Sequence, residues 1–97
     1  MDLCSAYFKS NMDAKTGQIL DALDGNPALK ENTIVVFTSN HGDMQGGHRS
    51  MAKSFPFEEC QRIPLIFAGP GIPVGKRIPS LVSLVDILPT LCDLVDI

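Results

Sequence analysis

The sequence predicts an α/β fold with a mostly parallel sheet and flanking helices. Three observations lead to this prediction. The chain begins with a long segment of helical pattern, continues with two short apolar runs, and ends with an apolar segment of helical spacing. A polar, glycine-rich stretch separates the two apolar runs, and ligands of open α/β sheets bind at loops that follow the carboxyl ends of strands.

The first predicted element is a helix over residues 3–23. This segment contains no proline and only one glycine, and four large apolar side chains share one helical face: Phe8, Met12, Ile19 and Leu23. A second face carries mostly small residues, which would allow the helix to pack on two sides. If the chain folds alone, we expect exposed apolar surface on this helix and on the strand edges, and self-association through it.

Two strands are predicted after this helix. The sequence Asp-Gly-Asn-Pro at residues 24–27 ends the helix with turn residues. Residues 34–37, Ile-Val-Val-Phe, form a continuous run typical of a parallel strand that is covered on both faces. Residues 63–68, Ile-Pro-Leu-Ile-Phe-Ala, form a second run, whose proline stands near the beginning, where a strand tolerates it.

A turn-rich connection and a final helix complete the predicted fold. Residues 69–76 contain three glycines, which are explained by turns. A phosphate-binding loop is not predicted there, because residue 70 is a proline where the G-x-x-x-x-G-K pattern requires glycine. Asp86 is placed to cap the last helix, and Pro89 fits its first turn.

The composition argues against several functional classes. The net charge is -3 and the eight Lys and Arg residues are scattered, so nucleic-acid binding is not expected. Cys4, Cys60 and Cys92 lack C-x-x-C spacing and are read as small buried apolar groups. Neither a signal peptide nor a membrane span is predicted. The length suits at most one small folding unit, over residues 1–97.

The polar loop over residues 38–53, TSNHGDMQGGHRSMAK, holds both histidines. The side-chain oxygen of Asn40 beside the imidazole of His41 would bind a divalent cation if further ligands converge on them. On chemistry alone a plain turn, hydrogen-bonded to the backbone, is the favoured explanation of this pair. His48 and Lys53 are equally explained as solvated loop residues, and Asp43 as a turn cap.

The chain also contains an ordered set of motifs, in NTIVVFTSNHGDMQGGHRSMAKSFPFEECQRIPLIFAGPGIPVGKR and then LVSLVDILPTLCDL. This set closely resembles the latter part of the catalytic domain of the type I, formylglycine-dependent sulfatases of the alkaline phosphatase superfamily. The family pattern is a strand, T-S-D-H-G-D, a G-x-H, a lysine, P-[FY]-E-E and R-I-P-L-I. The resemblance reaches back through AYFKSNMDAKTGQILDAL. It implies a layered α/β/α domain, of which this chain would be the C-terminal portion.

The resemblance implies a role for each matching residue of the loop. Asn40 stands where the family has an Asp that, with the next residue (His41 here), helps hold a calcium or magnesium ion against the sulfate. Lys53 matches an ammonium that binds the sulfate group, and His48 matches a histidine near the substrate, so both are candidate catalytic and substrate-binding residues. A metal and a fixed cation would stabilise the charge on the sulfate oxygens as the S–O bond breaks.

The chain departs from the family pattern in two respects. Asn40 contributes no negative charge, so weaker metal binding is predicted. The family nucleophile, a cysteine in C-x-P-S-R or a serine in its place that becomes formylglycine, is matched neither at Cys4 nor at Cys60, and the N-terminal acidic metal ligands are missing too. The isolated chain is therefore predicted to be inactive. Glu58 and Glu59 of the P-F-E-E motif are read as mainly structural.

Three functions remain open at this point. The first is a segment of a sulfuric ester hydrolase, with a sulfate ester as the substrate of the complete enzyme. The second is a degenerate, noncatalytic binding or scaffold protein, which Asn40 favours. The third is a metal-dependent phosphohydrolase of the same superfamily, although Lys53 and the P-F-E-E and R-I-P-L-I motifs favour sulfatases. The compartment stays open, since many sulfatases are exported and no export signal is recognised here.

Overall fold

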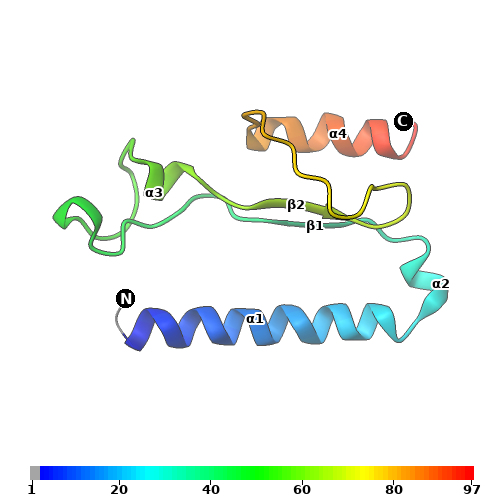
Figure 1. Cartoon of the computed structure of the whole chain (residues 1–97), viewed down its shortest axis with the longest axis horizontal. Coiled ribbons are helices and arrows are strands. Elements are labelled where there is room, and N and C mark those ends of the chain that lie inside the picture. Colours follow the sequence, from blue (N-terminus) through cyan, green and yellow to red (C-terminus); the bar gives the residue numbers. More distant parts are fainter. Residues whose placement is uncertain (1–2) are drawn as a thin grey trace. The chain divides into compact units, whose positions relative to one another are not determined.

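A computed structural model describes the backbone of residues 3–97 and the side chains of residues 6–97 (Figure 1). Its contacts divide the chain into two units, residues 1–33 and residues 34–97. The first unit contains helices α1 (Leu3–Asp24) and α2 (Pro27–Lys30). The second contains strands β1 (Val35–Thr38) and β2 (Leu65–Ala68), helices α3 (Glu58–Gln61) and α4 (Ile87–Leu94), and the 3₁₀ helices η1 (Gly47–Arg49) and η2 (Leu84–Asp86). This mixed content of helices and strands is compatible with the predicted α/β class, and the single partial domain stays a prediction.

Helix α1 confirms the predicted first helix. It ends at a turn in which the Gly25 N–H donates to the Asp21 carbonyl at 2.9 Å. The turn sequence also starts helix α2, which was not predicted: Asn26 Oδ1 accepts from the Leu29 N–H at 3.4 Å, and Pro27 occupies the first helical position. Large apolar side chains of α1 are exposed, as expected, among them Tyr7, Phe8, Met12 and Ile19. Self-association through them stays a prediction.

Strands β1 and β2 pair antiparallel, with Val35 opposite Ala68 and Thr38 opposite Leu65. The prediction of a mostly parallel sheet is therefore wrong for this pair. Parallel neighbours require a crossover connection, usually a helix packed on the sheet. Residues 39–64 form only short helical turns and fold back on themselves, so the second strand returns in the opposite direction (Figure 1).

The prediction of strands covered on both faces is also not met in the described part of the chain. Along β2, half-buried Leu65 and Phe67 alternate with exposed Ile66 and Ala68, the pattern of a strand covered on one face. Ile66 is 56% exposed and Phe37 of β1 is 38% exposed. A sheet of two short strands has too few neighbours to cover both faces.

The most deeply buried apolar residues lie in the loop between the strands. Met44 is 2% exposed and Cys60 is 7% exposed, the only described apolar residues in the buried class. The expected burial of Cys60 is thus confirmed, while Cys92 is half-buried and both thiols are free. The side chain of Cys4 lies outside the described residues. The loop therefore has a small packed centre of its own.

The C-terminal part of the second unit follows the predicted order of turns and helix. Gly71 and Gly75 have left-handed φ angles of 75° and 72°, as the turn prediction requires. Asp86 begins α4 as predicted, but its carboxylate accepts from the Ser83 N–H at 2.7 Å and so caps η2 instead. The reason is that η2 runs directly into α4. The backbone N–H groups that lack a helical partner therefore lie at the start of η2, one turn before α4 begins.

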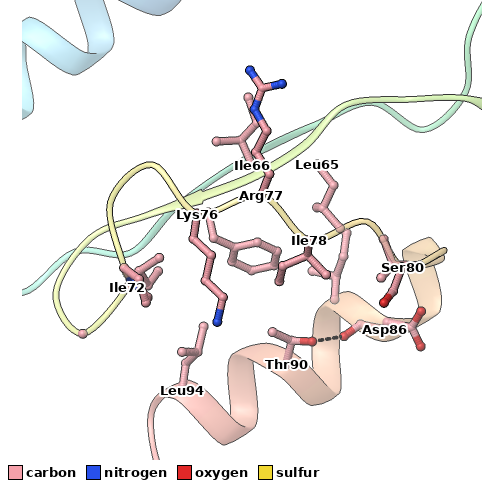
Figure 2. A pocket seen from close by; sticks show the side chains of 15 residues that line it. Leu65, Ile66, Ile72, Lys76, Arg77, Ile78, Ser80, Asp86, Thr90 and Leu94 are labelled. Atoms are coloured by element: carbon pink, nitrogen blue, oxygen red, sulfur yellow. Dashed lines mark hydrogen bonds between the residues drawn. The ribbon is translucent and has the colours of Figure 1, made fainter.

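A cavity of about 620 Å³ lies between β2, residues 71–82 and α4 (Figure 2). Its walls are mainly apolar, with Leu65, Ile78 and Leu94 among them, and the Lys76 side chain extends toward α4.

Within residues 3–97, no helix combines the length and the apolar character that crossing a membrane requires.

Candidate functional site

The candidate site is built on the loop that follows β1, and backbone hydrogen bonds close this loop on itself. The Gly42 N–H donates to the Cys60 carbonyl of α3 at 2.8 Å, beyond the ends of the two paired strands. The Met44 N–H donates to the Ala52 carbonyl at 2.8 Å, and the Met44 side chain is buried beneath this contact. Residues 42–60 thus form one closed loop with α3 as its returning arm.

Lys53 and His41 meet inside this loop. The Lys53 Nζ atom lies 3.1 Å from His41 Nε2, although the residues are 12 positions apart in sequence. His41 Nδ1 lies 2.7 Å from the Gly42 carbonyl oxygen. Because an ammonium group only donates and a carbonyl oxygen only accepts, the neutral imidazole carries its proton on Nδ1 and its lone pair on Nε2. The tertiary structure therefore gives His41 a defined tautomer and a cationic neighbour.

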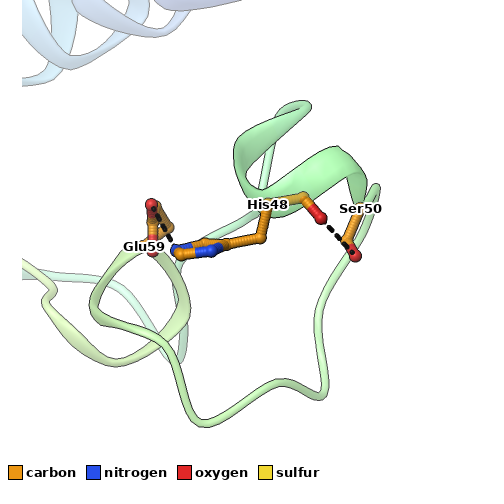
Figure 3. Close-up of polar contacts among 3 residues, drawn as sticks. All are labelled: His48, Ser50 and Glu59. Carbon is orange, nitrogen blue, oxygen red and sulfur yellow. Dashed lines mark hydrogen bonds and ion pairs between the residues drawn. The ribbon is translucent and has the colours of Figure 1, made fainter.

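His48 occupies a separate position in the same loop (Figure 3). Its ring stacks on Phe57, with ring centroids 4.1 Å apart and planes at 11°. His48 Nε2 lies 3.6 Å from Glu59 Oε1, and a recess of about 380 Å³ is lined by His48, Glu58, Glu59 and Arg62. In the part of the chain that is described, no hydrogen bond joins His48 to Lys53 or His41. The predicted site residues thus form two subsites.

The backbone of the loop adopts conformations that L-amino acids rarely take. Lys53 stands between Ala52 and Ser54, which have φ angles of 67° and 87°. Left-handed φ angles recur earlier in the loop, at Gln45, Gly46, His48 and Arg49. Such conformations cost about 1–3 kcal/mol each at non-glycine positions and persist only where surrounding contacts impose them. The loop therefore depends on its tertiary contacts at Met44 and α3.

The remaining predicted residues lie at the beginning of the loop. Asn40 is exposed, and its side chain forms no hydrogen bond with another described residue. The Asp43 carboxylate accepts from the Gln45 N–H at 2.8 Å, which confirms the turn-cap interpretation of Asp43. The Ser39 hydroxyl donates to the His41 carbonyl at 2.7 Å and so steadies the backbone that carries both candidate metal ligands.

Asn40 and His41 fit a divalent cation site only as a part of it. They offer one amide oxygen and one imidazole nitrogen, whereas calcium takes about six to eight ligands, mostly oxygen. No cluster of three His, Cys, Asp or Glu residues suited to a metal occurs among the described residues. The Nδ1–H bond to a backbone carbonyl is the outer contact that orients metal-binding histidines, so His41 has the required tautomer. In this arrangement the Lys53 ammonium donates to the lone pair on His41 Nε2, the same lone pair that a metal cation would bind.

Asn40→Asp is expected to raise calcium affinity on the order of tenfold, because it adds a negatively charged oxygen ligand to the set. Calorimetric titration of the chain with calcium measures the change. Asn11→Asp is the matched control, since it adds the same charge on α1 and should leave the affinity unchanged. Equal affinities for Asn40→Asp and the natural chain would count against a metal role for residue 40.

Sequence reasoning missed three contributors to the site: Gly42, Phe57 and Glu59. All three stand in recognised motifs, Gly42 in T-S-D-H-G-D and Phe57 and Glu59 in P-F-E-E, but a motif does not state which loop residues they contact. Glu58 agrees with the structural interpretation, because its carboxylate pairs with Arg62 at 2.7 Å one helical turn later. Only the position of Glu59, directly after Glu58 on the returning arm, hinted that a second carboxylate faces the loop.

Comparisons with known proteins agree in pointing to one family. A statistical model of a protein family described as Sulfatase matches residues 4–97. Arylsulfatase K of Rattus norvegicus is 44% identical over 85 residues, which are 88% of this chain and 15% of that protein. A sulfatase of Formosa agariphila is 42% identical over 85 residues, 88% of this chain and 17% of its own length.

Arylsulfatase K of Homo sapiens is 40% identical over 85 residues, 88% of this chain and 16% of that protein. The chain thus spans about one sixth of the length of these relatives. No solved structure matches it.

Proposed function

The chain belongs to the sulfatase family, and from this premise we propose that it is a segment of a sulfuric ester hydrolase carrying part of the metal and sulfate site. The observation that carries the proposal is the meeting of Lys53 and His41 at 3.1 Å in a loop that matches the family. We also propose that β1 and β2 belong to a layered α/β/α domain of the alkaline phosphatase type.

The chemistry assigned to Lys53 is electrostatic. Its ammonium is a point charge with three rotatable donors, so it can bind sulfate oxygens without a fixed bidentate geometry. In the structure its described polar partner is His41 Nε2, a neutral acceptor. A sulfate group offers a charged acceptor instead, and hydrogen bonds between two charged groups are the stronger ones. Sulfate is therefore expected to draw Lys53 away from His41.

The departure of Lys53 would free His41 for a cation. Its Nδ1–H bond to the Gly42 carbonyl leaves the Nε2 lone pair available, and the residue before it in sequence, Asn40, is exposed. A bound calcium or magnesium ion would supply positive charge that neutralises the sulfate oxygens. Asn40 and His41 would hold that ion together with ligands that the described residues do not supply.

The nucleophilic half of the reaction is not assigned to this chain. The formylglycine motif C-x-P-S-R is matched at none of the cysteines, and the Cys60 thiol is 7% exposed. We propose that the 97-residue chain is inactive by itself, and that a complete enzyme combines it with the nucleophile and with acidic metal ligands. A sulfate ester is the proposed substrate of that complete enzyme.

Turnover of an aryl sulfate by the purified chain tests this proposal, with calcium or magnesium present and Lys53→Ala measured in parallel. We expect no turnover from either protein, because no group of the described chain is placed to attack sulfur. Turnover that disappears with Lys53→Ala would mean that the chain assembles a catalytic centre without the family nucleophile. The half-site proposal would then be wrong.

A second candidate function is a noncatalytic binding or scaffold protein that has kept this part of the fold. Asn40 is the observation that favours it, because the family Asp is replaced by a residue without charge. Calcium affinity separates the two candidates. An Asn40→Asp variant that gains no affinity would favour the noncatalytic function, and a gain would favour the hydrolase segment.

A further inference from the structure

We propose that Glu59, together with Phe57, is a positioning residue that holds the His48 imidazole in the loop of the candidate site. The placement of His48 follows from its contacts with Phe57 and Glu59, and only its use in sulfate chemistry rests on the proposed function. His48 lies apart from the contact between Lys53 and His41, so its placement requires an explanation of its own.

Two side chains contact the His48 ring, Phe57 and Glu59, and Figure 3 shows the second of them facing the ring. Phe57 covers one face, in a stacked arrangement with centroids 4.1 Å apart. Glu59 faces the Nε2 edge, with Oε1 at 3.6 Å. That distance exceeds a direct hydrogen bond, so the carboxylate borders the ring edge without being bonded to it. A ring held on a face and on an edge has little freedom to turn.

The backbone of His48 depends on these contacts. Its φ and ψ angles are 49° and 28°, the left-handed region that residues other than glycine rarely adopt. Local preference therefore does not account for where the ring lies. The glycine before it, Gly47, lies against the Glu59 side chain, since a Cβ built on Gly47 would stand 3.2 Å from Glu59 Oε1. The Glu59 carboxylate thus fits into the turn that presents His48.

The Glu59 carboxylate is available for this role. The neighbouring acid, Glu58, is engaged with the Arg62 guanidinium at 2.7 Å. The Glu59 carboxylate lies nearest His48, and no Lys or Arg side chain pairs with it among the described residues. The two adjacent carboxylates of α3 therefore have different partners, and only the second one faces the candidate site.

Helix α3 consequently connects both histidines of the chain. Its Cys60 carbonyl accepts from Gly42, directly after His41, and its Glu59 carboxylate faces His48. With Nε2 turned toward Glu59, Nδ1 is the ring nitrogen of His48 left to meet a substrate. No hydrogen bond to Nδ1 of His48 is formed within residues 3–97.

Nuclear magnetic resonance of the histidine rings in the full chain tests this placement, because two histidines give two assignable sets of ring signals. Stacking on Phe57 should shift the His48 ring protons upfield of their unfolded positions. Glu59→Ala should move these signals toward the unfolded positions and leave the His41 signals in place. Glu59→Gln keeps the length and the oxygen of the side chain and should restore part of the shift.

Glu58→Ala is the matched control, because it removes the neighbouring carboxylate and only the exposed pair with Arg62. It should leave the His48 signals where they are. The proposal is wrong if His48 has unfolded signals in the natural chain, if Glu59→Ala leaves them unmoved, or if Glu58→Ala moves them equally. Phe57→Leu should also remove the upfield shift, and its persistence would contradict the stacked arrangement.

Sulfate titration of the same samples separates this proposal from the proposed function. If Glu59→Ala releases His48 while inorganic sulfate perturbs neither histidine, the positioning role stands and the sulfate site is wrong. If sulfate shifts the His41 signals and Glu59→Ala leaves His48 in place, the sulfate site stands and the positioning role is wrong. The two ideas can thus fail independently.

Discussion

Lys53→Ala is expected to weaken the binding of inorganic sulfate to the chain by about tenfold, the effect of one hydrogen bond between charged partners. Lys53 is exposed, and in the absence of sulfate its ammonium donates to a neutral imidazole nitrogen at 3.1 Å. Sulfate replaces that partner with a charged oxygen, which is the stronger acceptor. Alanine removes the charge and the donors together.

Sulfate binding is measured by titrating the chain with sodium sulfate while the His41 ring signals are recorded. Chloride at the same ionic strength accounts for screening, which acts on every exposed charge. Lys76→Ala is the matched control, since it removes an exposed lysine of the same unit that lines the cavity beside α4. Equal losses in the two variants would indicate general charge attraction and would remove the specific role of Lys53.

Gly42→Ala is expected to destabilise the second unit by about 1–3 kcal/mol, the usual cost of an added methyl group at a closely packed position. A Cβ at residue 42 would collide with the backbone carbonyl of Glu59, at the contact where Gly42 donates to the Cys60 carbonyl. A backbone obstacle cannot move aside as a flexible side chain can. Either this hydrogen bond is lost or α3 shifts away from the loop.

Denaturant unfolding of the chain measures the loss of stability in Gly42→Ala. Gly17→Ala is the matched control, because a Cβ there would meet no described atom within 4 Å and α1 is helical around it. That change should stabilise the helix by about 1 kcal/mol, the difference in helix propensity between alanine and glycine. Unchanged stability of Gly42→Ala would show that α3 does not lie against residue 42.

The elements of this fold were largely predictable from local patterns. The helical periodicity of residues 3–23 corresponds to α1. The bounds of the two apolar runs differ from those of β1 and β2 by at most two residues. Turn residues were read correctly at Gly71 and Gly75, but the Asn-Pro pair that starts α2 was read only as an end. Each of these features depends on residues close together in sequence, which the pattern itself contains.

The sequence named candidate residues for the site but did not indicate their arrangement. Motif spacing named Asn40, His41, His48 and Lys53, and the family that supplied these motifs is confirmed by the comparisons. Spacing did not indicate that Lys53 lies against His41, or that His48 lies against Phe57 and Glu59 instead. The metal, sulfate and catalytic roles of these residues stay predictions.

The sequence by itself determined the first and last helices, the two strands and the family, because periodicity, turn residues and ordered motifs are properties of neighbouring positions. The tertiary structure alone decided the antiparallel direction of β1 and β2, the burial of Met44 and the two separate subsites. These features depend on contacts between positions far apart along the chain, where closing a loop costs entropy that favourable contacts must offset. A local sequence pattern does not indicate which distant contacts are favourable enough to offset that entropy cost.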